Sequence, residues 1–225
     1  MRERIARIES DLLVVGEGTG DASLIRYLSQ DRGIDGFQVL DAGGSSQFQR
    51  FIEGLPALPG YAGMKGLVIV ADSDQGAEDS FKTIVSQLKA AKIHARPGTP
   101  FRVGRSPQSD FVTYVIMIPF TGAGDNIAPL TGALESLLLP AALERSPDLA
   151  KCTDQWCECV QMQRWRNTHR DKARLRALIA AVHPDDPNIS LSWALNPERK
   201  IIPFSHACFN PLADLLRSLR SVMGL

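Results

Sequence analysis

The chain has 225 residues, of which 44% are hydrophobic, and its 25 Lys and Arg balance 25 Asp and Glu to a formal net charge of +0. This size allows one elaborated domain or two small ones, and the neutral balance argues against unspecific polyanion binding while leaving room for a local basic patch. The sequence has no run of eighteen or more apolar residues, which excludes a membrane-spanning helix.

The N-terminal residues 1–9 alternate in charge and contain no apolar signal core, so we expect a cytoplasmic protein. The apolar run at residues 12–15 predicts a buried strand, which ends at Gly16-Glu17-Gly18. Asp21 is placed to cap a helix that continues from Ala22 and stops near Gly33.

Strand and helix signals then alternate up to residue 92. The strands are predicted at residues 37–42 and 67–71, and the helices at residues 46–55 and 77–92. This β-α-β-α-β-α order predicts an α/β fold with a mostly parallel, Rossmann-like sheet flanked by helices.

After residue 95 the pattern changes. Residues 101–103 and 114–119 predict two more strands, arranged as a hairpin across residues 104–110, and residues 120–129 predict a glycine-rich loop. The remaining predictions are a helix from Leu134, a continuous basic helical stretch over residues 151–182, a loop over 184–197 and an amphipathic helix over 212–222. We therefore expect an α/β domain at residues 1–140 and a helical, basic C-terminal extension at 141–225, packed on the same domain.

Carboxylates follow two of the predicted strands at the point where each strand ends. Glu17 follows the first strand, and Asp72 and Asp74 follow the strand at residues 67–71. If these strands are neighbours, the side chains meet at one edge of the sheet, about 5 Å apart. Carboxylates at such an edge suit Mg²⁺, whereas the alternatives are a helix-dipole charge for Glu17 and an Asx-turn for the aspartates.

These residues resemble the Toprim domain, the metal-binding fold of topoisomerases, bacterial primases and OLD-family nucleases. Glu17-Gly18 with Asp21 matches its first motif, and Asp72-Ser73-Asp74 with Gly76 matches its second. The family often carries a sheet-packing residue where this chain has Gly16, which departs from the pattern without removing an acid. The resemblance implies a site in which Glu17, Asp72 and Asp74 bind Mg²⁺ or Mn²⁺.

The second half of the chain is similar to the compact OLD-like branch of Toprim proteins, which lacks a fused ATPase. That similarity implies that Glu135 and Asp21 help to bind a second metal, and that Lys172 neutralises charge on the reacting phosphate. The function it implies is a metal-dependent nuclease that cleaves DNA or RNA, acting with an ATPase partner in defence or repair. For Asp21 the alternative is helix capping alone, for Glu135 an exposed first-turn charge, and for Lys172 a solvated helix charge.

A dense basic segment spans residues 163–176 and includes one tryptophan. Such a segment is typical of a phosphate-binding helix with a stacking residue, and only one carboxylate within it is available for pairing. The predicted nucleic-acid-binding residues are Arg164, Trp165, Arg166, Arg170 and Arg174.

Two other functions remain open. One is a non-catalytic Toprim-like module that binds metal or nucleic acid and works through a partner protein, and the other is a phosphatase acting on small phosphate esters. The sequence contains neither a Gly-x-x-x-x-Gly-Lys-Ser/Thr loop for ATP nor a Gly-x-Ser-x-Gly elbow of hydrolases. The cysteines at 152, 157, 159 and 208 are either reduced core thiols or part of a zinc site, and their spacing contains no C-x-x-C pair.

Overall fold

A computed structural model describes residues 7–74 and 76–225, and its centre is a five-stranded sheet. The strand order is β2 (Gln38–Asp41), β1 (Leu12–Gly16), β3 (Gly66–Asp72), β5 (Ser109–Ile118) and β4 (Gly104–Ser106). All neighbouring pairs are parallel except β4 with β5. The predicted α/β fold with a mostly parallel sheet is therefore confirmed. The N-terminal pattern behind the cytoplasmic expectation lies mostly outside the described residues.

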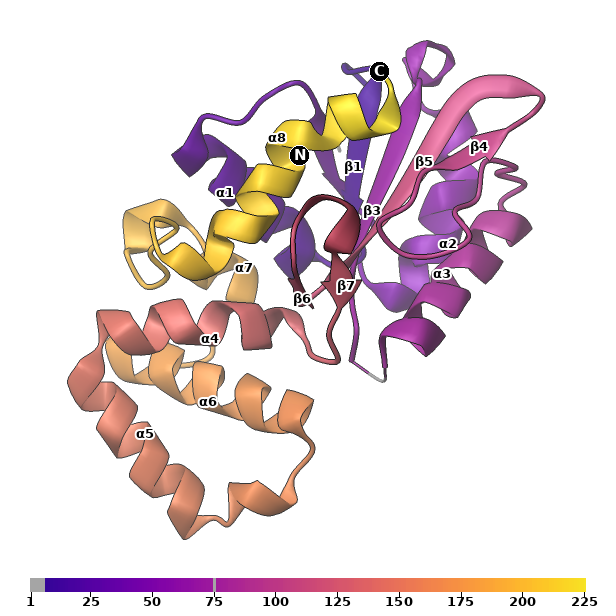
Figure 1. The fold of residues 1–225 in the computed structure, drawn as a ribbon. Helices are drawn as coiled ribbons and strands as arrows, with labels where there is room; N and C mark the ends of the chain where they lie inside the picture. The colour runs from indigo at the N-terminus through magenta and orange to yellow at the C-terminus, as the bar shows by residue number, and fades with distance from the viewer. Residues whose placement is uncertain (1–6, 75) are drawn as a thin grey trace.

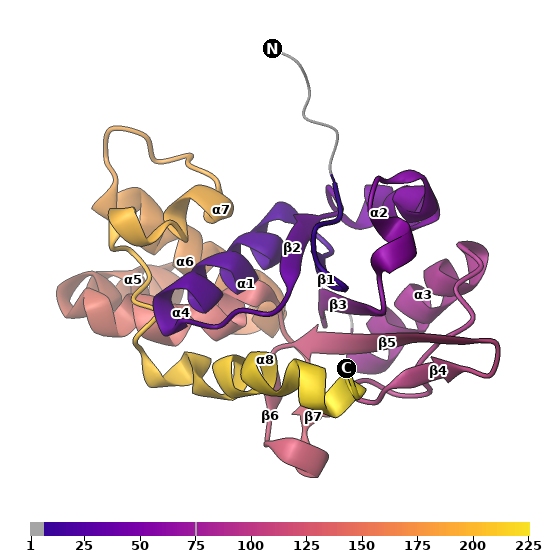
Figure 2. The ribbon, with the colours of Figure 1, turned by 90° about the horizontal axis from the view of Figure 1, so that it is seen from above.

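Helices cover both faces of the sheet, as Figures 1 and 2 show. One face carries α1 (Thr19–Arg32) and α8 (Asn210–Met223), and the other carries α2 (Ser45–Gly54) and α3 (Ala77–Ala90). Coverage on both faces explains why β1 and nearly all of β3 are buried and consist of apolar, often β-branched residues.

A layer of helices lies beyond the carboxyl ends of the parallel strands, at the bottom of Figure 1. It contains α4 (Leu134–Arg145), α5 (Pro147–Cys159) and α6 (Asn167–Val182), with α7 (Leu191–Ala194) beside α1. The predicted boundary between residues 140 and 141 falls inside α4, and the division into two parts stays a prediction. Among the described residues, no helix is both long and apolar enough to cross a bilayer.

Short elements connect this framework. The two-residue strands β6 (Phe120–Thr121) and β7 (Ala128–Pro129) pair as a small antiparallel ribbon. The 3₁₀ turns are η1 (Leu55–Ala57), η2 (Tyr61–Gly63), η3 (Gly124–Asn126), η4 (Met162–Arg164), η5 (Pro197–Arg199) and η6 (Ala207–Phe209).

Several predicted elements differ from the structure. Residues 101–103 do not form a strand, because Phe101 has a left-handed backbone (φ 58°) and the hairpin partner is β4 instead. The helical stretch over 151–182 is interrupted after Cys159, where Gln161 (φ 54°) turns the chain before α6 begins. Residues 120–129 contain the β6–β7 ribbon, and α7 lies within the predicted loop over 184–197.

Candidate metal and nucleic-acid site

Glu17, the first of the acidic residues, lies at the edge of the sheet where the adjacent strands β1 and β3 both end. β1 pairs with β3 over its full length, and the backbone N–H of Glu17 donates to the carbonyl of Val70 at 2.9 Å. Asp72 is the last residue of β3. The expected adjacency of the two acid-bearing strands is therefore confirmed, and Glu17 and Asp72 lie at the same edge of the sheet.

Asp21 reaches this edge from the first turn of α1. The helix begins at Thr19, two residues before the predicted cap, and Oδ2 of Asp21 accepts a hydrogen bond from the N–H of Gly18 at 2.9 Å. Gly16 has a packing role: a Cβ atom there would collide with the backbone of Ala22, so its absence lets α1 approach β1 closely. Asp21 is only 7% exposed, although its other carboxylate oxygen, Oδ1, has no hydrogen-bond partner.

Asp74 stands in the turn after β3, where Lys172 of α6 contacts it. The Lys172 Nζ atom lies 2.5 Å from Oδ2 of Asp74. The same turn is fixed to the start of the helical layer, because the N–H of Gly132 donates to the carbonyl of Ser73 at 3.3 Å. That connection brings the first turn of α4, with the buried Glu135, close to the acidic residues.

Four of the five predicted metal ligands line one cavity of about 450 Å³. They are Glu17, Asp21, Asp72 and Asp74. Glu135 lies next to this group and interacts electrostatically with Asp21, Asp72 and Lys172.

Sequence reasoning missed the polar wall of the cavity. The wall is formed by Ser45 at the start of α2 and by Asp79, Ser80, Thr83 and Gln87 of α3. Ser80, Thr83 and Gln87 recur at i, i+3 and i+7, a helical period that could have identified this face of α3.

Burial and mutual repulsion raise the pKa values of three of these carboxyl groups. Burial, followed by the charges of Asp21, Asp74 and Glu135, raises the pKa of Asp72 to about 9. Burial also raises the pKa of Asp21 to about 7, and burial with the charge of Asp74 raises the pKa of Glu17. Burial opposes the charge of Lys172, but its hydrogen bond and attraction to Asp74 outweigh that effect and raise its pKa. Full ionisation of these acids would place more negative charge in the cavity than Lys172 alone can balance, so some of them stay protonated near neutral pH.

The residues fit the divalent cation that the Toprim resemblance implies. Carboxylate oxygens are the ligands of hard cations, and Oδ1 of Asp21, Asp72 and Asp74 are all buried without a hydrogen-bond partner. The described side chains do not form a ready-made coordination shell, since no three acidic, His or Cys groups among them stand in metal-binding geometry. Chemistry and unpaired oxygens thus favour a cation, and its binding would require the side chains to move.

The predicted nucleic-acid-binding residues divide into two sets. Arg164, Trp165 and Arg166 are exposed in the segment between α5 and α6, which contains the short turn η4, and not on the continuous helix that was predicted. Arg174 instead forms an ion pair with Asp154 of α5, and Arg170 lies 3.9 Å from the carboxylate of Asp171. The expectation that carboxylates were too few for pairing was wrong for Arg174, because its partner comes from outside the basic segment.

The four cysteines are free thiols. Cys152, Cys157 and Cys159 lie on α5, where Cys152 and Cys159 are exposed and Cys157 is half-buried. Cys208 is half-buried in η6. Within the described part of the chain, none of them belongs to a group of metal-binding geometry.

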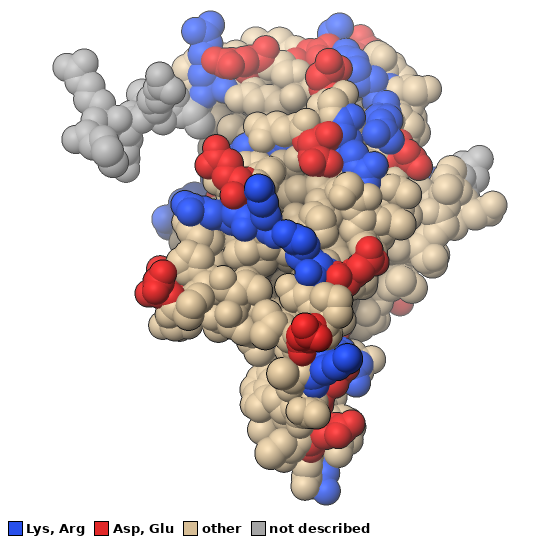
Figure 3. Space-filling view, turned by 90° about the vertical axis from the view of Figure 1, so that its left-hand side faces the viewer, with Lys and Arg blue, Asp and Glu red and all other residues tan. Residues whose placement is uncertain are grey.

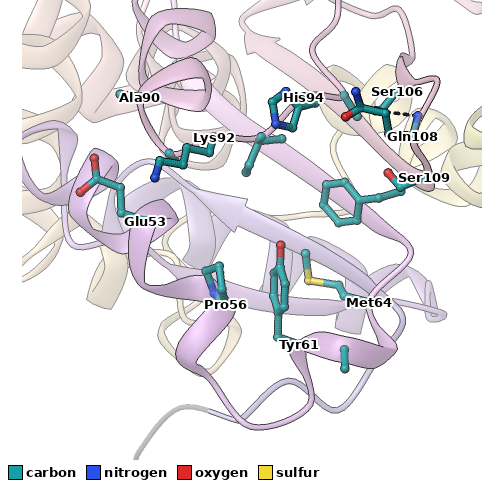
Figure 4. Close-up of a pocket in the computed structure, with 15 residues that line it drawn as sticks. Glu53, Pro56, Tyr61, Met64, Ala90, Lys92, His94, Ser106, Gln108 and Ser109 are labelled. Atoms are coloured by element: carbon teal, nitrogen blue, oxygen red, sulfur yellow. Dashed lines mark hydrogen bonds between the residues drawn. The ribbon is translucent and has the colours of Figure 1, made fainter.

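A larger cavity, of about 870 Å³, lies near the opposite, amino ends of β3 and β5. Figure 4 shows Tyr61 and Met64 on one side of it and His94 and Gln108 on the other, with Lys92 and Glu53 at one end. Its lining contains one carboxylate, that of Glu53, so this cavity lacks the clustered acids of the strand-end site.

Comparisons with known proteins show the family to which the chain belongs. Two solved structures of the C-terminal region of the Xanthomonas campestris pv. campestris OLD protein, one phased with mercury and one with iodine, are similar to this chain. Each has a TM-score of 0.38 and 12% sequence identity, covering 96% of this chain and 99% or 98% of the other. No curated protein matches significantly. A family model described as "Protein of unknown function (DUF3226)" matches residues 10–221, and the chain therefore belongs to that family.

Proposed function

We propose that this protein is a Mg²⁺- or Mn²⁺-dependent nuclease of the compact OLD-like Toprim type, hydrolysing phosphodiester bonds in DNA or RNA. The observation that carries the proposal is the strand-end cavity, where Asp21, Asp72 and Asp74 each keep one buried carboxylate oxygen without a hydrogen-bond partner. A bound divalent ion would supply charge neutralisation at the phosphate and an activated water.

In this proposal Glu17, Asp72 and Asp74 hold one ion, and Asp21 and Glu135 help to hold a second. Lys172 stands beside Asp74, with its ammonium group positioned to neutralise charge that develops on a phosphate in the cavity. The polar side chains of α3 line the same cavity and would orient the substrate. The α/β domain at residues 1–140 provides most of the site, and the extension at 141–225 contributes Lys172.

Nucleic acid is the substrate class that the exposed Arg164, Trp165 and Arg166 favour, because they combine charge for the backbone with a ring for stacking. We further propose an ATPase partner and a role in defence or repair. That part rests on the resemblance to the OLD-like branch and on the lack of a Walker motif in this sequence.

The test is a cleavage assay on plasmid, single-stranded DNA and structured RNA, with Mg²⁺, Mn²⁺ or EDTA. We expect cleavage of at least one substrate with metal and none with EDTA. Cleavage that persists in EDTA would overturn the proposal. Because no ready-made coordination shell is present among the described residues, a non-catalytic module is the second candidate. Metal binding without turnover of any substrate, with or without an ATPase partner, would favour that module.

Replacing the exposed arginines should weaken binding to nucleic acid in a salt-dependent manner. If Arg164 and Arg166 each contact a phosphate, the Arg164→Gln/Arg166→Gln variant should flatten the plot of log K against log salt by about 1.8 for duplex DNA, or about 1.4 for a single strand. The matched control is Arg170→Gln/Arg174→Gln, which removes the same charge from side chains that already face carboxylates. An unchanged slope in the first variant would show that nucleic acid follows another path.

A further inference from the structure

A second basic site lies at the far end of α4 from Glu135. It is a hollow of about 380 Å³ between the C-terminal ends of α4 and α6 and the chain after η5. Its lining combines aliphatic side chains, here called the floor, with three exposed basic side chains, here called the rim. The floor consists of Ala142, Leu178, Val182 and Ile201, the rim of Arg145, Arg199 and Lys200, and Ser146 completes the lining. Figure 3 views this side of the molecule, where basic side chains form a band across the middle of the face.

The rim is held in place before any ligand binds. The Arg199 guanidinium lies 3.9 Å from the centre of the Trp193 ring, and His183 supports that ring edge-on at 4.7 Å. Stacking leaves the N–H groups at the edge of the guanidinium available to an anion. The Arg145 Nε atom donates to the carbonyl of Lys200 at 3.5 Å, and this links the other two rim residues.

The cations of the rim are not engaged in ion pairs with described residues, although the exposed carboxylate of Glu198 precedes Arg199 in the chain. Among the described residues, none of the three rim side chains forms an ion pair, and the adjacent Glu144 is bound to His206 at 2.8 Å. The ends of α4 and α6 contribute roughly half a negative charge each through their macrodipoles. A phosphomonoester carries a charge of roughly −1.5 to −2 and three terminal oxygens, so it can accept hydrogen bonds from more of these cations than a singly charged phosphodiester can.

The aliphatic floor indicates which chemical group accompanies the phosphate in the ligand. Val182 is 37% exposed, so an apolar side chain is open to solvent in the same hollow as the three cations. A nucleotide has both parts, a phosphate for the rim and a planar base for the floor, and about 380 Å³ lies within the range of small-ligand sites.

We propose that this hollow binds a nucleotide through its phosphomonoester, either at the end of a nucleic-acid strand or as a free nucleotide. Binding of the end of a nucleic-acid strand, as opposed to a free nucleotide, rests on the proposed nuclease function. The first turn of α4 holds Glu135 and its last residue is Arg145, ten residues away and about 15 Å along the helix. A strand held at its end would thus lie within a few nucleotides of the acidic cavity.

The test measures fluorescence anisotropy of three single-stranded oligonucleotides of one sequence, with a 5′-phosphate, a 3′-phosphate or no terminal phosphate. EDTA is present throughout, so binding is separated from cleavage. We expect a terminal phosphate to increase affinity about tenfold, as new charge-assisted hydrogen bonds would. If AMP competes with the oligonucleotides, free nucleotides are ligands as well. If AMP does not compete, the ligand is restricted to the ends of nucleic-acid strands.

The Arg145→Gln/Arg199→Gln/Lys200→Gln variant should lose this preference and bind all three oligonucleotides alike. Arg50→Gln, on the exposed side of α2, should retain it, and thermal melting of each variant checks that it is folded. The Asp72→Asn/Asp74→Asn variant should also retain the preference for a terminal phosphate. A loss of cleavage without a loss of this preference therefore distinguishes the nuclease proposal from the phosphate-site proposal. Equal wild-type affinity for the three oligonucleotides, together with no binding of AMP, would overturn the proposal.

Discussion

Replacing Asp72 by asparagine is expected to reduce metal-dependent cleavage by roughly 10²–10³-fold, the usual effect of removing one group that stabilises charge in a transition state. The same variant should make the metal-free protein more stable. Because burial and neighbouring acids raise the pKa of Asp72 to about 9, the folded protein resists its ionisation at neutral pH. Each pKa unit is equivalent to about 1.36 kcal/mol, so the cost at pH 7 is on the order of a few kcal/mol.

The sign of the pH dependence follows from the raised pKa values. A carboxyl group with a raised pKa in the folded state stabilises the protein below its ordinary pKa of 3.8, and this stability is lost as the pH rises toward about 7 for Asp21 and about 9 for Asp72. In EDTA, the wild-type melting temperature should therefore fall between pH 5 and pH 8. It should fall less in Asp72→Asn, and Mg²⁺ should restore it only in the wild type.

Asp79→Asn is the matched control, because it changes an exposed carboxylate at the rim of the same cavity. It should leave the pH dependence of melting unchanged. An Asp72→Asn variant that melts like wild type in EDTA at pH 8, or that cleaves at the wild-type rate, would contradict the account of this residue.

Lys172→Met is expected to reduce cleavage about 100-fold while leaving nucleic-acid binding largely intact. The ammonium group lies 2.5 Å from Oδ2 of Asp74 and interacts with Asp72 and Glu135, so its removal takes away the cation of the acidic cavity. Methionine keeps most of the aliphatic volume of the side chain. The measurements are the cleavage rate at saturating substrate and the affinity for the same substrate in EDTA.

Two comparisons separate a catalytic role from a structural one. Lys172→Arg keeps the charge and should retain more activity than Lys172→Met. Lys89→Met removes an exposed lysine of α3 and should have no effect. If Lys172→Met loses binding and cleavage in equal proportion, the lysine contributes to substrate affinity and not to the chemical step.

The sheet and the acidic edge were predictable because their signals are local. A buried parallel strand is a continuous apolar run, as at residues 12–15 and 67–71, and parallel strands place their last residues at one edge. The positions of Glu17 and Asp72 follow from that rule. Asp21 was expected to cap α1, but the N-cap is Gly18, three residues earlier, and Asp21 lies in the first turn of the helix.

The ion pair of Arg174 and the second basic site were not predictable, because they depend on contacts between distant segments. In the sequence Arg174 has no nearby carboxylate partner, whereas in the structure α5 places Asp154 beside it. This contact requires the break after Cys159, and no glycine or proline marks that break in the sequence. The rim of the second basic site joins Arg145 with residues 199–200, more than fifty positions later. No short-range pattern contains such information.

Isothermal titration calorimetry with Mn²⁺ is the most direct test of the central claim that the strand-end carboxylates bind a divalent metal. We predict saturable binding to the wild-type protein with release of protons, since the raised pKa values of Asp21 and Asp72 leave these groups partly protonated before the metal binds. Asp72→Asn/Asp74→Asn should abolish the binding, and Asp79→Asn should retain it. Equal Mn²⁺ affinity in the wild type and in Asp72→Asn/Asp74→Asn would contradict the assignment of the metal site.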